Sequence, residues 1–397
     1  MSLLFEKNFF GFFKEFLDAD TCRTLLGVSK HVAQQIEARD CIERIFYRES
    51  DFIRYKISTE NFPKLRHVSF EMYGHYEAPE SETLLHLDCF RTVCDLSALR
   101  APRLEVLGAG DLRQATALNA DLPNLRSLDI SFSDVAALPA TFLLLEVCNV
   151  SFTPVLAIPS VFVNITTLLI SGTDITAIPH LPALEILHAD GCVALTEIPP
   201  TLTALRELSV NATEISEIPK TLTSLVTLEC ANNPFLLALP KELEQLEQLN
   251  CSCTIIDAIP KTFKNLKILK AFDTYIEDIP ATFEALEHLD IRDAPVKHLE
   301  PMQHLAFLDC FNTKVPYLPH FPQLELLYAS SNARPCLLPK LIYMYITPLD
   351  VYPDAPMLQT LIMDGEFPAV PEMYSAVPKI RTTQCNFFFE SDSDNDD

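Results

Sequence analysis

The sequence has no long hydrophobic run. Of its 397 residues 48% are hydrophobic, yet its longest apolar stretches are far shorter than the ~20 residues that a membrane-spanning helix needs. The Phe-rich N-terminus is interrupted by charges, so no signal-peptide core forms there. These charges are Glu6, Lys7, Lys14 and Glu15. We therefore expect no contact with membrane and a location in the cytoplasm or the nucleus.

Positive charge is scarce. Lys and Arg total 30 against 54 Asp and Glu, which gives a formal net charge of -24. A chain of this sign repels nucleic acid and anionic lipid, so both are excluded as partners. A protein with a basic surface is the partner that this charge favours. Residues 390–397 carry five of the acids, and their composition predicts a disordered acidic tail.

Sequence motifs of catalysis are absent. There is no G-x-S-x-G, no P-loop and no dinucleotide-binding fingerprint. The pair Cys251 and Cys253 has the wrong spacing for a zinc knuckle, and no second pair follows it. We therefore expect no enzyme activity, no catalytic residue, no metal site and no cofactor.

Glycine is rare, with 8 residues against 29 prolines, so proline and threonine must form the turns. The 12 cysteines do not indicate disulfides. Several of them stand where a small core residue is expected, and a buried free cysteine behaves as a small hydrophobe. These are Cys89, Cys230, Cys251, Cys310 and Cys385. A reducing compartment follows from this use of cysteine.

A repeat of 19 to 21 residues runs through most of the chain. Its first half reads L-x-x-L-x-(small or aliphatic), as in residues 125–130, and its second half reads T-x-I-x-x-I-P, as in residues 213–219. About seventeen units are present. Their leading positions are residues 65, 84, 104, 125, 145, 165, 184, 205, 225, 246, 266, 286, 305, 324, 341, 358 and 380.

This pattern resembles the leucine-rich-repeat family across residues 60–389. The resemblance implies a solenoid, α/β but mostly β, in which the L-x-x-L-x-L segments form one long parallel sheet. One unit buries too little apolar surface to offset the ordering of its backbone, so only stacked units fold. The Ile-Pro step leaves room for extended segments or single turns, but not for a helix, on the convex side.

The position that carries an asparagine ladder in this family is mostly threonine here, with Asn at 233 and 332. We expect the threonine hydroxyls to bond buried backbone groups in place of the amides. The residues concerned are Thr153, Thr173, Thr213, Thr254, Thr274 and Thr313.

Residues 1–59 lack the repeat and show apolar residues at helical spacing, with one helix expected over Val32–Tyr47. Residues 13–30 resemble an F-box, the segment that binds a Skp-type adaptor in cullin–RING ubiquitin ligases. The resemblance assigns adaptor binding to Phe13, Phe16, Leu17, Leu25, Leu26, Val28 and Lys30. The alternative is a plain helical cap on the open end of the solenoid.

Partner binding is expected on the concave row of the last third of the repeats. The third and fifth residues of each motif point outward, and the seventh continues their row. There the row changes from small and polar to aromatic, which is the composition of interface hot spots. The candidate residues are Phe272, Asp290, Arg292, Phe307, Asp309, Phe311, Tyr328, Tyr343 and Tyr345. The alternative is that the C-terminal flank covers this patch.

Together these observations predict a protein-binding solenoid. The F-box resemblance implies the substrate receptor of a cullin–RING ubiquitin ligase, with a Skp-type adaptor on the N-terminal helices and a basic substrate protein on the concave face. The alternative is a non-enzymatic pathogen effector or scaffold, or a component of a structural assembly, that binds proteins through the repeats.

Overall fold

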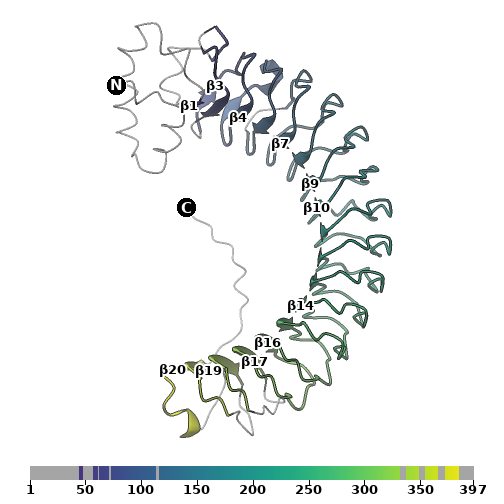
Figure 1. Cartoon of the computed structure of the whole chain (residues 1–397), viewed down its shortest axis with the longest axis vertical. Coiled ribbons are helices and arrows are strands. Elements are labelled where there is room, and N and C mark those ends of the chain that lie inside the picture. The colour runs from purple at the N-terminus through teal and green to yellow at the C-terminus, as the bar shows by residue number, and fades with distance from the viewer. Residues whose placement is uncertain are drawn as a thin grey trace. The chain divides into compact units, whose positions relative to one another are not determined.

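A computed structural model describes residues 44–47, 57–60, 62–70, 73–112, 116–330, 337–347, 354–364 and 372–383. The chain divides into two compact units, Met1–Leu205 (unit 1) and Arg206–Asp397 (unit 2). Within each unit, short strands lie side by side along the inner face and the loops that join them project outward (Figure 1).

Short strands follow one another at the repeat spacing. In unit 1 they are β1 (Arg44–Tyr47), β2 (His67–Phe70), β3 (His75–Tyr76), β4 (His86–Asp88), β5 (Val93–Cys94), β6 (Val106–Gly108), β7 (Ser127–Asp129), β8 (Val147–Asn149), β9 (Thr167–Leu169) and β10 (Ile186–His188). In unit 2 they are β11 (Glu207–Ser209), β12 (Thr227–Glu229), β13 (Gln248–Asn250), β14 (Ile268–Lys270), β15 (His288–Asp290), β16 (Phe307–Cys310), β17 (Leu326–Ala329), β18 (Tyr343–Ile346), β19 (Thr360–Asp364) and β20 (Lys379–Thr383). Two 3-10 turns, η3 (Leu96–Ala98) and η4 (Glu372–Tyr374), complete the described elements.

All pairings within each unit are parallel, and their register follows the repeat. The central leucine of one strand stands opposite that of the next, as Leu107 does to Leu128 in unit 1 and Leu269 to Leu289 in unit 2. Strands β3 and β5 form a separate parallel pair in unit 1. The fold is therefore a mostly-β parallel solenoid, as the repeat predicts.

The Ile-Pro step starts the convex side of each repeat. In one unit-2 repeat the N–H of Leu222 donates to the carbonyl of Pro219, and the N–H of Leu225 then donates to the carbonyl of Leu222. Two consecutive turns therefore lead from the proline back into the next strand. Proline suits this position because its carbonyl accepts a bond while its missing N–H is not needed.

The core of both units is built from repeat positions. The leading and central leucines are almost fully buried, and phenylalanines between the repeats fill the widest part of the core. Those fully or almost fully buried are Phe142, Phe162, Phe263, Phe283 and Phe321. This burial supplies the main favourable free energy of folding.

The threonine ladder is confirmed. Each predicted threonine is buried, and its Oγ1 donates to the carbonyl three residues earlier, as in Thr173 to Ile170 at 2.7 Å. The same bond is formed by Thr153, Thr213, Thr254, Thr274 and Thr313. Asn233 makes more bonds, since its Nδ2 donates to the carbonyls of Val210 and Cys230 and its Oδ1 accepts from Thr213. Asn332 lies outside the described residues.

The cysteines predicted to fill core positions do so as free thiols. Cys89, Cys230, Cys251 and Cys310 are buried and unpaired, and Cys385 lies outside the described residues. Burial raises the pKa of the Cys251 thiol to about 12, so this group stays protonated at neutral pH. Such thiols pack as small hydrophobes and are poor nucleophiles.

Two sequence-based expectations are wrong. The helix predicted over Val32–Tyr47 does not extend to its end, because residues 44–47 form β1, which pairs in parallel with β2. The repeat sheet therefore begins before residue 60. Predicted leading positions 65 to 358 each lie two residues before a strand, but Ile380 lies within β20, opposite Leu361 of β19. The leading position of that repeat is Val377.

The described residues contain no α-helix, so the predicted helical cap, most of which lies outside them, stays a prediction. The disordered tail at 390–397 also lies outside them. In the described part of the chain, no helix is long and apolar enough to cross a bilayer.

Candidate protein-binding surface

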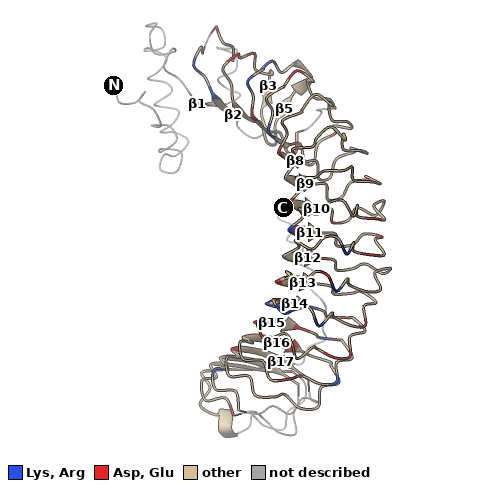
Figure 2. Ribbon diagram, turned by 45° about the vertical axis from the view of Figure 1, so that its right-hand side comes forward, with Lys and Arg blue, Asp and Glu red and all other residues tan. Residues whose placement is uncertain are grey.

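The inner strand face of each unit presents the third and fifth motif residues, as predicted. In β7 the central Leu128 is buried, while Ser127 and Asp129 on either side are partly exposed. The inner strands of unit 1 carry mainly uncharged residues, whereas acidic and basic segments follow one another from β13 to β16 of unit 2 (Figure 2). The two faces therefore differ in chemistry although they share one backbone.

The aromatic residues predicted in unit 2 lie in contact across neighbouring strands. Tyr328 is central, with ring centroids 5.9 Å from Phe307, 5.4 Å from Tyr343 and 5.8 Å from Tyr345. Phe311 meets the edge of Tyr345 at 6.1 Å. All five are half-buried, so each ring packs on its neighbours while part of it faces solvent. Offset and edge contacts of this kind hold rings in place before a ligand arrives.

Arg292 joins the remaining predicted residues to this row. Its guanidinium lies over the Phe272 ring, 4.4 Å from the centroid. It also forms ion pairs with Asp290 at 3.4 Å and Asp309 at 3.9 Å. Since the N–H of Phe311 donates to Asp309, all nine predicted residues form one connected network, named here the aromatic surface.

The two carboxylates of this surface lie largely buried beneath it. Asp290 and Asp309 are each 7% exposed, and each accepts the N–H two residues later. Asn149 makes the same bond in unit 1, so it belongs to the repeat. The carboxylates therefore support Arg292, whose side chain remains 40% exposed and carries its positive charge to the solvent side of this surface.

Burial raises the pKa values of both carboxyl groups of this surface. Burial raises the pKa of Asp309 to about 6, against the lowering effect of the Phe311 N–H. The neighbouring Asp290 raises it further, and Arg292 lowers it. Burial also raises the pKa of Asp290. Two acids thus share one guanidinium, and one of them titrates only slightly below neutral pH.

The turns after residue 337 continue the sheet. Strands β18, β19 and β20 pair in parallel with their predecessors, so these described segments extend the inner face and do not fold back over the aromatic row. This arrangement favours an accessible surface. Residues 384–397 lie outside the described part.

Two further residues, His288 and Asp364, extend the surface and are absent from the predicted set. His288 stacks on Phe307 with centroids 4.0 Å apart, and Asp364 accepts the Tyr345 hydroxyl at 2.9 Å. Burial, followed by a hydrogen bond with Tyr328, raises the pKa of Tyr343 to about 12, and Arg381 opposes this rise. His288 occupies the third motif position, so its place in the row was predictable, but its stacking was not.

Unit 1 carries exposed aromatic residues at a motif position outside the concave row predicted from the sequence. Phe132 and Phe152 occupy the eighth motif residue and are 58% and 53% exposed. Their spacing of 20 residues could have revealed them. The predicted adaptor-binding residues, in contrast, lie outside the described residues, and adaptor binding stays a prediction. They are Phe13, Phe16, Leu17, Leu25, Leu26, Val28 and Lys30.

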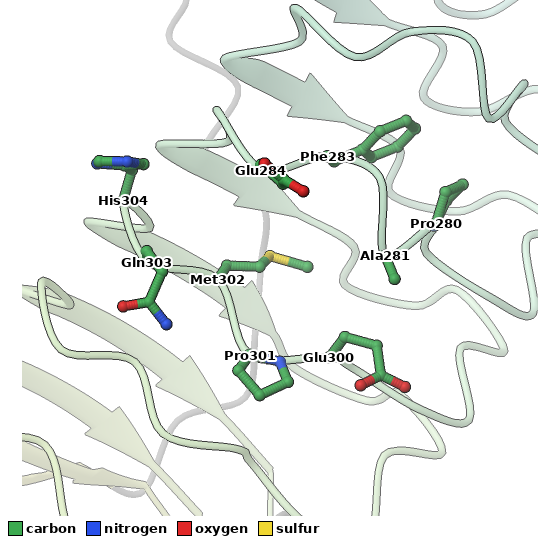
Figure 3. A pocket seen from close by; sticks show the side chains of 9 residues that line it. All are labelled: Pro280, Ala281, Phe283, Glu284, Glu300, Pro301, Met302, Gln303 and His304. Carbon is green, nitrogen blue, oxygen red and sulfur yellow. The ribbon is translucent and has the colours of Figure 1, made fainter.

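A hollow on the outer side of unit 2 is too small for a typical ligand. It encloses about 160 Å³ between the turns at Pro280 and Pro301, with the Met302 side chain pointing into it (Figure 3). Small-molecule sites usually enclose about 300–1,000 Å³. Among the described residues, no group of three or more His, Cys, Asp or Glu side chains could hold a metal ion.

Comparison with known proteins supports the fold. No protein-family model and no curated sequence matches the chain. Solved structures do match it, including the functional domain of InlJ from Listeria monocytogenes, which includes a cysteine ladder (TM-score 0.62, 21% identity, 72% of this chain and 70% of that chain). The LRR protein LIC12759 of Leptospira interrogans matches at TM-score 0.60, with 16% identity over 79% of this chain and 85% of that chain.

A structure of the Toll–Spatzle complex from Drosophila also matches, at TM-score 0.57 and 15% identity over 77% of this chain and 51% of that chain. These identities are low, so the similarity establishes the leucine-rich-repeat fold alone.

Proposed function

We propose that this protein is a non-enzymatic scaffold that binds a protein ligand on the aromatic surface of unit 2. The observation that carries the proposal is the connected network from Phe272 to Tyr345. It offers half-exposed rings, a supported guanidinium and tyrosine hydroxyls in one place. Aromatic residues and arginine dominate the binding energy of protein interfaces, and rings held by their neighbours lose little freedom on binding.

The fold agrees with this role. A solenoid presents a long inner face to which many repeats contribute, so it can bind an extended protein surface without a deep pocket. The Toll–Spatzle structure describes a complex of a protein with the same fold. A comparable partner is proposed for this chain.

The test compares capture of proteins from a lysate by three forms of the full chain. Phe307→Ala with Tyr328→Ala removes the centre of the network, while Tyr275→Ala with Tyr317→Ala removes two rings of unit 2 that are each 62% exposed and lie outside the network. The partner should be lost more than tenfold with the first pair and retained with the second. Equal retention by both variants would refute binding at this surface.

The finer role that we propose is that of a substrate receptor in a cullin–RING ubiquitin ligase, located in the cytoplasm or nucleus. It rests on the F-box resemblance of residues 13–30, which implies docking of a Skp-type adaptor. Purified adaptor should co-elute with the full chain in gel filtration, and Leu25→Asp should abolish this. If the wild-type chain does not bind the adaptor, the alternative of a scaffold or effector without a ligase partner holds.

A further inference from the structure

Unit 1 places bulky aromatic side chains where the backbone is least suited to them. Phe132 and Phe152 both have φ of 57°, in the left-handed region. A side chain with a Cβ is disfavoured there, and a bulky one more so. The equivalent turns elsewhere carry small or polar residues, which are Arg91, Asp111, Gly172, Gly191, Ala212, Asn232, Cys253, Asp273, Asp293 and Asn312. The two phenylalanines therefore cost stability at the backbone, and they gain little in return from burial, since each is more than half exposed.

A neighbouring glycine makes room for the Phe152 ring. The Phe132 and Phe152 rings stack with centroids 4.5 Å apart and an interplanar angle of 13°. A Cβ added at Gly172 would lie 2.5 Å from the Phe152 ring, so the ring occupies the space that a side chain would take. In the same way Phe90, which is 39% exposed, lies against Gly110. We name Phe90, Phe132 and Phe152 the phenylalanine rib.

The charge beside the rib is negative. Asp88 and Asp129 end the inner strands β4 and β7 next to it, and Asp190 follows the end of β10 by two residues. Among the described residues at these positions the cation is Arg91, whose guanidinium pairs with Asp111 at 3.0 Å and lies 5.3 Å from the centroid of the Phe90 ring. A basic ligand would meet acids here without a competing free cation.

We propose that the phenylalanine rib is a second protein-binding surface, which takes a basic segment that carries an apolar or aromatic anchor. The anchor packs against the edges of the stacked rings, and the Lys or Arg residues of the segment face Asp88 and Asp129. A second copy of this chain is a poor occupant, because each copy has a formal charge of -24. The strained backbone supports a binding role, since strain is retained where function needs a particular side chain.

This surface is independent of the aromatic surface of unit 2. The rib lies within unit 1 and is made of phenylalanine, and the cation beside it, Arg91, is paired with Asp111, whereas unit 2 offers tyrosines and Arg292. Loss of binding at one surface should therefore leave the other unchanged.

The experiment measures fluorescence anisotropy of labelled synthetic peptides with the full chain in 150 mM salt. Three 14-residue peptides are compared, which combine Lys with Phe, Lys with Ser, and Glu with Phe in a Gly/Ser background. The key variant is Phe132→Asn with Phe152→Asn, because Asn232 and Asn312 already occupy the equivalent turns. Its net charge equals that of the wild type, so general attraction of a basic peptide to an acidic chain is unchanged.

The Lys/Phe peptide should bind the wild type about tenfold more tightly than the Asn variant, and the Glu/Phe peptide should not bind. The unit-2 variant Phe307→Ala with Tyr328→Ala should bind like the wild type. Equal affinity of the wild type and the Asn variant for the Lys/Phe peptide, or equal binding of the Glu/Phe and Lys/Phe peptides, would overturn the proposal.

A second variant tests the proposal even if the Phe132→Asn, Phe152→Asn variant does not fold. Asp129→Asn removes one charge and keeps the acceptor for the Ser131 N–H, as Asn149 does for Ser151. It should weaken the Lys/Phe peptide about threefold at 150 mM salt, and the difference should disappear at 1 M salt. An unchanged affinity at 150 mM salt would contradict the proposed place of the basic residues.

Discussion

The inner faces of units 1 and 2 are built on the same repeat and differ in how their aromatic residues are held. In unit 2 the rings stand on the strands, in relaxed extended backbone, and support one another around Tyr328. In unit 1 the rings of Phe132 and Phe152 stand on the turn after the strand, in left-handed backbone. A repeat fixes the core and leaves the surface free, so one scaffold can carry two surfaces of different chemistry.

Equivalent core substitutions should destabilise units 1 and 2 to the same extent. Phe162→Ala in unit 1 and Phe263→Ala in unit 2 remove equivalent, fully buried rings. Each should lower the free energy of unfolding by about 3–5 kcal/mol, because a large cavity is left. Denaturant titration of both variants checks this. A cost several-fold smaller in one unit would show that the two cores are not equivalent.

The asparagine of the ladder in unit 2 should contribute more stability than a threonine of the ladder in unit 1. Asn233→Ala leaves the carbonyls of Val210 and Cys230 without their amide donor and removes the acceptor for Thr213. We expect a loss of about 2–3 kcal/mol, against about 1 kcal/mol for Thr173→Val in unit 1, which breaks the bond to the Ile170 carbonyl and a weak one with the Cys192 sulfur. Thermal unfolding of the two variants tests the difference. Similar costs would mean that the number of ladder bonds does not matter.

Unit 2 should also respond to pH through Asp309. Its pKa is raised from 3.8 to about 6, so its ionised form is less favourable in the folded than in the unfolded chain. The folded state therefore gains stability from this group as pH falls from about 6 to about 4, by about 1–3 kcal/mol. Asp309→Asn should remove this gain and raise stability at pH 7.

Denaturant titrations at pH 7, 6, 5 and 4 measure this effect. Asp129→Asn in unit 1 is the matched control, because Asp129 holds the same strand position and is partly exposed. If Asp309→Asn and the control have the same pH profile as the wild type, the burial of Asp309 has no consequence for stability.

The smallest effect should come from ion pairs between the turns. Arg126 pairs with Glu146 in unit 1, and both side chains are nearly half exposed. Exposed pairs contribute little because water and salt screen them, so Arg126→Ala should change the free energy of unfolding by less than about 0.5 kcal/mol. A loss above 1 kcal/mol would mean that surface charges, and not only the core, hold the turns of unit 1 together.

The sequence predicted the features that many repeats share. These features are the positions of the strands, the buried leucines and the threonine ladder. Each recurs in many similar units, so an irregular residue in one unit did not obscure them. Prediction from the sequence failed where a single segment had no similar repeats to compare with. Ile42, Ile45 and Phe46 fit helical spacing, yet pairing with β2 makes Arg44–Tyr47 a strand, because long-range contacts override local preference. At the last repeat, the irregular spacing hid Val377.

The candidate surface was predicted in part for the same reason. Alternation along the strand placed all nine unit-2 residues on one face, but spacing could not show that Asp290 and Asp309 are buried beneath Arg292. Phe132 and Phe152 of the phenylalanine rib were missed because their placement depends on φ at the eighth motif residue. Sequence patterns favour glycine or asparagine in that backbone region, so a phenylalanine there gives no signal of its own.

Hydrogen exchange of the full chain, with and without its captured protein partner, tests the central claim most directly. We predict that amides of β16, β17 and β18, together with the N–H of Phe311, exchange more slowly in the complex. Protection confined to the outer turns of unit 2, with β16–β18 unchanged, would contradict binding at the aromatic surface.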